Sequence, residues 1–249
     1  MPPTRLLLPR LGPFHLPRSP LSHPRRTFLS SILSSAAGAP PPPQTLTASR
    51  RLPYNHAALY ALIADIDSYS AFLPYCSVSR VTAWTPPRAD PDFGDGRRWP
   101  TRADLTAGWG GIEQTYTSRV FCVPGSIVEA LSGDGARSGI APDVLARHGL
   151  SDDGPPSAPL STAGSGEGVF KTLVTRWTVT PVQTGTPAAR GEGAGALRTG
   201  GQPEWSDVNL NIRFQFANPL FGAVSSAIAD RIAPVMIEAF VDRAKKVLG

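Results

Sequence analysis

Histidine and cysteine are the side chains that most often bind metals or act as bases and nucleophiles, and this chain has few of them. They are His15, His23, His56, His148, Cys76 and Cys122. Two of the histidines precede any patterned segment and a third lies in a Gly- and Pro-rich stretch, so they do not form a cluster. The cysteines have no Cys-x-x-Cys spacing. We therefore expect no metal site, and we interpret both cysteines as small apolar side chains.

Carboxylates could supply a general acid and base, and three of them lie beside apolar segments. Asp65 and Asp67 are two residues apart on a predicted helix, so they point to different faces and cannot share a proton. Glu113 stands alone on a predicted strand. The chain also lacks a Gly-x-Ser-x-Gly nucleophile motif and a Gly-x-Gly-x-x-Gly nucleotide motif. These patterns predict no catalytic residues and favour a binding protein over an enzyme.

The net charge of +5 is concentrated at the N-terminus. Seven arginines and no acidic residues occur up to Arg51, and the remaining 17 basic residues face 19 acidic ones, a balance of about −2. A near-neutral domain does not indicate nucleic-acid binding. The Arg- and Ser-rich start, with Arg26-Thr27-Phe28 as a cleavage signal, predicts a mitochondrial transit peptide and Pro-rich spacer over 1–45. No run of 18 apolar residues predicts a transmembrane helix.

Hydrophobic periodicity predicts the elements of a single domain over 46–249. Asn55 is a predicted N-cap for a helix with an apolar stripe, and a short helix over 68–73 follows it. A two-residue period then predicts strands, and a long helix beginning at Asn218-Pro219 ends the chain. The candidate strands are 46–52, 75–84, 99–107, 113–123, 126–132, 169–180 and 207–217. Three Gly-, Ser- and Pro-rich segments are predicted to be disordered insertions: 85–98, 133–168 and 183–204.

Four segments carry a family resemblance in the right order. They are Tyr60–Cys76, with its Tyr-Ser-Ala-Phe-Leu-Pro-Tyr-Cys end, Glu113–Ser118 (Glu-Gln-Thr-Tyr-Thr-Ser), Phe170–Trp177 and the Phe-Gln-Phe strand Ile212–Phe216. Together they resemble the coenzyme Q-binding protein family, mitochondrial type, of the START-like (polyketide cyclase/dehydrase) superfamily. The resemblance implies an α+β helix-grip fold, in which a curved antiparallel sheet wraps around a long C-terminal helix.

The resemblance also implies an apolar tunnel between that helix and the sheet. We expect twelve side chains to line it: Phe72, Leu73, Tyr75, Tyr116, Trp177, Phe214, Phe216, Phe221, Val224, Ile228, Ile232 and Val235. Tyr75, Tyr116 and Arg119 are candidates for polar contacts with a head group. Four residues are expected to dock the tunnel mouth on a membrane: Trp109, Arg243, Lys245 and Lys246.

By this resemblance the bound ligand is ubiquinone or a related isoprenoid lipid, and no cofactor is needed. The protein would act as a quinone chaperone or carrier that supports respiratory electron transport and ubiquinone biosynthesis. It would lie peripherally on the matrix side of the mitochondrial inner membrane, where ubiquinone-biosynthesis or respiratory complexes are possible partners. Two alternatives stay open, a polyketide cyclase or dehydratase and a ribosome-associated protein.

Overall fold

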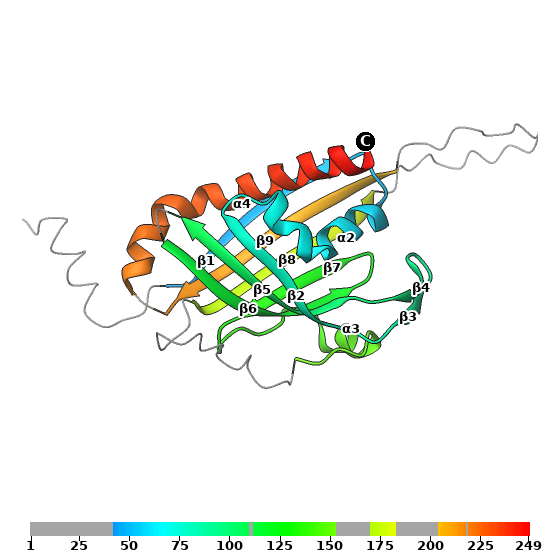
Figure 1. The fold of residues 1–249 in the computed structure, drawn as a ribbon, viewed down its shortest axis with the longest axis horizontal. Coiled ribbons are helices and arrows are strands. Elements are labelled where there is room, and N and C mark those ends of the chain that lie inside the picture. The colour runs from blue at the N-terminus through cyan, green and yellow to red at the C-terminus, as the bar shows by residue number, and fades with distance from the viewer. Residues whose placement is uncertain (1–41, 110–111, 153–169, 183–203, 218) are drawn as a thin grey trace, which may run out of the picture. The chain divides into compact units, whose positions relative to one another are not determined.

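The computed structural model describes residues 42–109, 112–152, 170–182, 204–217 and 219–249 (Figure 1). The predicted transit peptide, most of the predicted insertion 183–204 and the second half of 133–168 lie outside these residues. So does Asn218, the predicted cap of the last helix. Of residues 109, 112 and 219–230 the backbone alone is described. Among the described helices, none combines the length and the hydropathy needed to cross a membrane.

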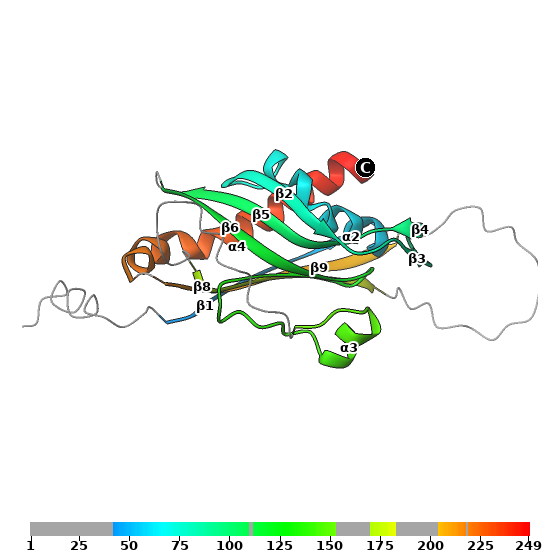
Figure 2. The ribbon, with the colours of Figure 1, turned by 60° about the horizontal axis from the view of Figure 1, so that its bottom comes forward.

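A seven-stranded antiparallel sheet forms the body of the described domain, in the order β1-β9-β8-β7-β6-β5-β2. Its strands are β1 (Gln44–Leu52), β2 (Cys76–Trp84), β5 (Pro100–Trp109), β6 (Ile112–Val123), β7 (Ile127–Ser132), β8 (Phe170–Val182) and β9 (Trp205–Phe216). The helices are α2 (His56–Ala64), the 3-10 helix η1 (Ile66–Ala71), α3 (Pro142–Arg147) and α4 (Pro219–Leu248). The sheet curves, and α4 runs along its inner side (Figure 2). The predicted α+β fold is confirmed.

Strand β9 shows how the sequence defines the two faces of this sheet. Its residues alternate without a break, so that Leu210, Ile212 and Phe214 are buried on the inner face while Asn209 and Arg213 are exposed. Alternate residues of a strand point to opposite faces, and apolar residues therefore gather on the side covered by α4. The same rule places Leu173, Trp177 and Val179 of β8 on the inner face beside the apolar residues of β9.

Helix α2 and η1 complete the inner core and cover one edge of the sheet. The Asn55 side chain accepts hydrogen bonds from the backbone of Ala57 and Ala58, at 2.7 and 3.3 Å, as predicted for an N-cap. In η1, the Asp67 carboxylate accepts a hydrogen bond of 2.6 Å from the backbone N–H of Val81. This contact satisfies a donor of edge strand β2 that would otherwise be open to pairing with another chain.

The phase of α4 differs from the predicted one. Its buried side is formed by Ala233, Ile237, Phe240, Val241 and Ala244, whereas Val235 is 39% exposed. The prediction continued the apolar stripe from Ile232 by three residues to Val235. The face that meets the sheet instead continues by four residues to Met236, and both steps are close to the 3.6 residues of one helical turn. The prediction for Val235 was therefore wrong.

Residues 85–98 form an ordered β-hairpin where a disordered insertion was predicted. Strands β3 (Arg88–Asp90) and β4 (Gly94–Arg97) pair with each other. Phe93, between them, packs at right angles on Trp99, with ring centroids 4.9 Å apart. Trp99 also packs on Tyr60 of α2 at 5.1 Å. These aromatic contacts supply the apolar burial that the Pro- and Gly-rich composition of the segment concealed.

Residues 133–152 also differ from the predicted disorder, because they cover the outer face of the sheet. The segment, which includes α3, buries Ile140 and Leu145 against Phe121 and Val174 of the sheet. Beneath it, Glu129 of β7 is completely buried and forms an ion pair with Arg176 of β8. The Glu129 carboxylate also accepts hydrogen bonds from the Ser138 hydroxyl and the Gly139 amide. A buried charge needs such partners, and they fasten the segment to the sheet.

We predict that Glu129→Ala destabilises the domain by about 3 kcal/mol, because it leaves the Arg176 guanidinium largely buried without a counter-charge. This loss of stability lies at the low end of the range for breaking a buried ion pair, because the Arg176 side chain keeps 27% exposure. Urea unfolding measures the change. Asp143→Ala, which breaks the exposed Asp143–Arg147 pair, is the control and should cost less than about 0.5 kcal/mol. Equal losses in the two variants would contradict a fastening role for Glu129.

Candidate functional site

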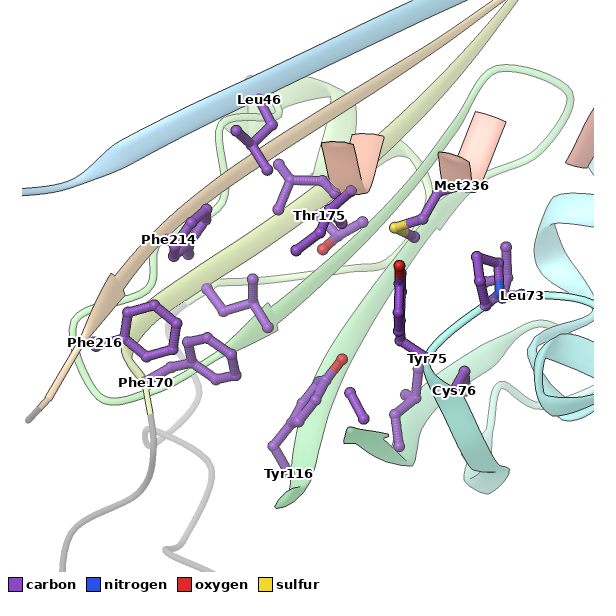
Figure 3. Close-up of a pocket in the computed structure, with 16 residues that line it drawn as sticks. Leu46, Leu73, Tyr75, Cys76, Tyr116, Phe170, Thr175, Phe214, Phe216 and Met236 are labelled. Atoms are coloured by element: carbon purple, nitrogen blue, oxygen red, sulfur yellow. The ribbon is translucent and has the colours of Figure 1, made fainter. Parts of the chain in front are cut away.

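An apolar cavity of about 140 Å³ lies between the inner face of the sheet and α4 (Figure 3). Residues from β1, β2, β5, β6, β8, β9 and α4 form its wall, so distant parts of the sequence contribute to it. The lining residues are Leu46, Leu73, Pro74, Tyr75, Cys76, Leu105, Ala107, Tyr116, Phe170, Leu173, Thr175, Ile212, Phe214, Phe216, Ile232 and Met236. No charged side chain occurs among these described residues.

A second cavity of about 70 Å³ adjoins the first and reaches further under η1. The two share six lining residues, namely Leu73, Leu105, Tyr116, Leu173, Thr175 and Met236. The inner cavity extends to Tyr69 and Trp177, and Trp177 packs on Phe240 of α4 with ring centroids 5.3 Å apart. The shared residues form a partition between the cavities, and movement of their side chains would join the two into one channel.

Aromatic rings form one wall of the larger cavity. Phe170 stacks on Phe216 at 5.1 Å, and Phe216 meets the edge of Phe214 at 5.4 Å. The Tyr116 ring lies against Phe170 at 5.5 Å. Aromatic side chains bury large areas and have few rotatable bonds, so this wall offers a rigid apolar surface to a ligand.

The polar groups of the cavity are neutral. They are the hydroxyls of Tyr75, Tyr116 and Thr175 and the thiol of Cys76. Burial raises the pKa of the Tyr116 hydroxyl and that of the Cys76 thiol, so both groups stay protonated at neutral pH. The Cys76 thiol donates to the Val78 carbonyl oxygen at 3.4 Å. The cavity therefore offers hydroxyl donors in an apolar surrounding.

Tyr75 marks the place where the cavity meets the solvent. Its side chain is 49% exposed, whereas every other lining residue is buried or half-buried. The opening therefore lies beside the segment Pro74–Cys76, which leads into edge strand β2. Ile232 and Met236 of α4 line the same cavity, so the opening lies between β2 and the middle of the helix.

The structure brings together about half of the predicted tunnel residues: Leu73, Tyr75, Tyr116, Phe214, Phe216 and Ile232. Trp177 lines the inner cavity instead. Phe72 lines neither cavity, because its ring packs on Tyr69 at 5.7 Å, and Val235 points away from the sheet. The side chains of Phe221, Val224 and Ile228 lie outside the described residues.

Arg119 does not reach the cavity, so its prediction as a head-group contact was wrong. It lies on the outer face of β6, where its guanidinium is 2.9 Å from the Asp152 carboxylate. Its neighbours in the strand, Ser118 and Val120, line the inner cavity. The alternation of a strand turns Arg119 to the opposite side from both of them.

Of the three cations predicted to surround the tunnel mouth, Arg243 packs beside the segment that leads to the opening, whereas Lys245 faces away from it. Arg243 stacks over the ring of Phe72 at 5.7 Å, and Lys245 pairs with Asp242 at 3.3 Å. Lys245 follows Met236 by nine residues, which is two and a half helical turns, so the two side chains leave opposite sides of α4. Lys246 is exposed near the end of the helix. The side chain of Trp109 lies outside the described residues.

Asp67 and Glu113, two of the carboxylates considered for catalysis, have structural contacts. Asp67 caps the edge of β2, as described above, and Glu113 accepts a hydrogen bond from the Ser77 hydroxyl. The Asp65 carbonyl oxygen accepts from the Ser68 hydroxyl at 2.9 Å. Within the described residues no group of three or more His, Cys, Asp or Glu side chains could hold a metal ion.

Several lining residues were missed by sequence reasoning: Leu46, Leu105, Phe170, Leu173, Thr175, Ile212 and Met236. The strand residues among them were available from the alternation of β1, β5, β8 and β9, which places them on the same face as predicted residues. Met236 could have been found by extending the stripe four residues beyond Ile232. The sequence does not show at which end of the inner face the side chains leave a cavity.

Comparison with known proteins places this geometry in a family. The polyketide cyclase/dehydrase and lipid transport family matches residues 52–139 and 157–241. The mitochondrial coenzyme Q-binding protein of Schizosaccharomyces pombe is 29% identical over 80% of this chain and 85% of its own length. Its counterpart in Eremothecium gossypii is 27% identical over 94% of this chain and 87% of its own length. A ribosome association toxin of Pseudomonas aeruginosa is 25% identical over 81% of this chain and 95% of its own length.

Among solved structures, a START superfamily protein of Mycobacterium smegmatis aligns with a TM-score of 0.47 and 10% identity. The alignment covers 82% of this chain and 98% of that protein. The resemblance stated from the sequence motifs is confirmed. Because the family match extends over most of the described domain, this chain belongs to the polyketide cyclase/dehydrase and lipid transport family.

Proposed function

We propose that this chain binds coenzyme Q in the apolar cavity beneath α4 and acts as a carrier or chaperone for the quinone. The observation that supports the proposal best is the cavity itself, which has an apolar wall, neutral hydroxyls and no charged side chain among its described lining residues. Two relatives that match most of the chain are named coenzyme Q-binding proteins, which agrees with a neutral lipid as the ligand.

The size of the cavity indicates how much of such a ligand it holds in this conformation. A cavity of about 150 Å³ accommodates one benzene-sized group, and the larger cavity here measures about 140 Å³. It has room for a bare six-membered ring or for roughly one isoprene unit, which is less than the fully substituted quinone head group occupies. A longer part of the ligand needs the partition at Met236 to move, or it extends through the opening at Tyr75. Each methylene-sized group that leaves water contributes about 0.8 kcal/mol.

A carrier role, rather than catalysis, fits the side chains that surround the cavity. The groups that reach it are hydroxyls and a protonated thiol, which can orient a ligand by hydrogen bonds. The carboxylates of Asp67 and Glu113 are engaged outside it, and Asp65 lines neither cavity. We infer that the protein supports respiratory electron transport and ubiquinone biosynthesis by presenting the quinone, and that it does not transform it.

We place the protein at the mitochondrial inner membrane, peripherally and on the matrix side. The two coenzyme Q-binding relatives are named as mitochondrial, and the Arg-rich, acid-free N-terminus has the composition of an import signal. Peripheral attachment agrees with the absence of a membrane-spanning helix among the described residues. Ubiquinone-biosynthesis or respiratory complexes are the partners that this location suggests.

The ligand can be identified directly. Protein purified from its own host should carry an isoprenoid quinone, detected by solvent extraction and mass spectrometry. Met236→Lys should reduce quinone retention at least tenfold, because the ammonium would enter an apolar space without a counter-charge. Val235→Lys is the matched control, since Val235 precedes Met236 directly in α4 and is exposed, and it should retain quinone like the parent.

Circular dichroism must show that Met236→Lys remains folded, and Met236→Gln serves as a milder substitution if it does not. Extracts without any quinone, or equal retention by the Met236 and Val235 variants, would reject the proposed site. Turnover of a polyketide substrate by the purified protein would favour the cyclase alternative instead.

Import processing tests the proposed location. We expect the mature N-terminus, sequenced from isolated mitochondria, to lie near Phe28–Leu29. Arg26→Ala should impair this cleavage because it removes the arginine of the predicted signal, whereas Arg18→Ala should leave the cleavage position unchanged. Full-length protein that still begins with Met1 inside the organelle would contradict the transit-peptide prediction.

A further inference from the structure

Tyr75 has an unusual backbone conformation for its residue type. Its φ is 65°, and it is the one non-glycine residue with a positive φ in the part of the chain that the structure describes. In this left-handed region Cβ comes close to the following carbonyl oxygen, a cost that glycine avoids and asparagine reduces. A bulky aromatic residue at such a position indicates that its side chain is needed there, because strained residues concentrate at functional sites.

Contacts on both sides fix this conformation. The Tyr75 carbonyl oxygen accepts a hydrogen bond of 2.9 Å from the backbone N–H of Gly108 in β5. Pro74 precedes it with a restricted φ, and Cys76 follows it as the first residue of β2, paired with Ala107. The backbone at Tyr75 therefore has little freedom to relax, and its ring is held at one place on the rim of the cavity.

The Tyr75 ring lines the cavity although it is half exposed, and its hydroxyl points into the space beneath α4 (Figure 3). The Tyr116 hydroxyl points into the same cavity from β6. Neither hydroxyl forms a hydrogen bond with another residue in the described part of the chain. A ligand that supplies a hydrogen-bond acceptor to a hydroxyl in an apolar surrounding is therefore bound more tightly.

We propose that Tyr75 determines the specificity of the site by donating a hydrogen bond to a carbonyl oxygen of the quinone ring, with Tyr116 as the second donor deeper in the cavity. This inference rests on the proposed function, since it assumes that a quinone occupies the cavity. It goes beyond that function by naming the residues that recognise the head group of the quinone. A hydrocarbon of the same shape makes the apolar contacts but leaves both hydroxyls unpaired, and it is bound less tightly for that reason.

Two probes separate recognition of the ring oxygens from apolar binding. One is a dimethoxy-methyl-benzoquinone that carries a decyl chain, and the other is decylbenzene, which has a similar shape and no carbonyl groups. Quenching of tryptophan fluorescence reports quinone binding, and competition with a fluorescent lipid reports binding of decylbenzene. Tyr75→Phe removes the hydroxyl and keeps the ring. Tyr54→Phe, at a tyrosine outside both cavities, is the matched control.

Tyr75→Phe should weaken quinone binding about 3- to 10-fold, the value of one hydrogen bond, and should leave decylbenzene binding unchanged. Tyr116→Phe should act in the same way, and Tyr54→Phe should change neither affinity. Unchanged quinone affinity in Tyr75→Phe, or an equal loss for both probes, would overturn the inference while leaving quinone binding intact. If the parent protein binds neither probe, the proposed function itself fails.

Tyr75→Gly gives a second test that does not depend on a subtle change in affinity. Glycine accepts the positive φ, so this variant should melt at a higher temperature than the parent and lose its preference for the quinone over decylbenzene. A Tyr75→Gly protein that keeps the preference would overturn the inference.

Discussion

Phe240 packs on Trp177 with ring centroids 5.3 Å apart, and this contact holds α4 against the inner face of the sheet. Beside it Ile237 and Ala244 are fully buried, so helix and sheet meet without a gap. Towards the N-terminus of α4, Met236 and Ile232 face a space instead. The helix and the sheet therefore separate here around a cavity of about 140 Å³, opposite its aromatic wall.

On the outer face, two strands that line the cavities are held together by a buried ion pair. Glu129 and Arg176 form their buried ion pair on β7 and β8. The residues that flank them, Ala130 and Thr175 among others, point inward and line the cavities. The family match stops at residue 139 and resumes at 157, so α3 lies in a segment that this chain adds to the family pattern. The added segment therefore covers the outer face of the sheet, where Leu145 of α3 packs in one cluster with Phe121 and Val174.

Hydrophobic periodicity predicted the fold well, because burial of one face of a strand or helix makes apolar residues recur at a fixed spacing in the sequence. The strands, the Asn55 cap and the length of α4 all follow from local rules. The hairpin at 88–97 was missed since its order comes from Phe93 packing on distant rings, which composition does not show. The alternation of β6 already separates Tyr116 from Arg119, so naming both as ligand contacts contradicted the strand pattern. The phase of α4 required knowledge of the partner surface.

The polarity of the cavity limits the class of ligand more sharply than its size does. The charged side chains of the described sheet line neither cavity, and the pairs of Arg119 with Asp152 and of Arg51 with Asp207 lie on its outer face. A fatty-acid carboxylate in the cavity would lie among apolar groups without a counter-charge, at a cost that its chain could not offset. A neutral lipid with carbonyl oxygens avoids this cost and can accept hydrogen bonds from the hydroxyls of Tyr75 and Tyr116. The absence of charged side chains from the described lining therefore favours a neutral ligand over an acid, in agreement with the proposed quinone.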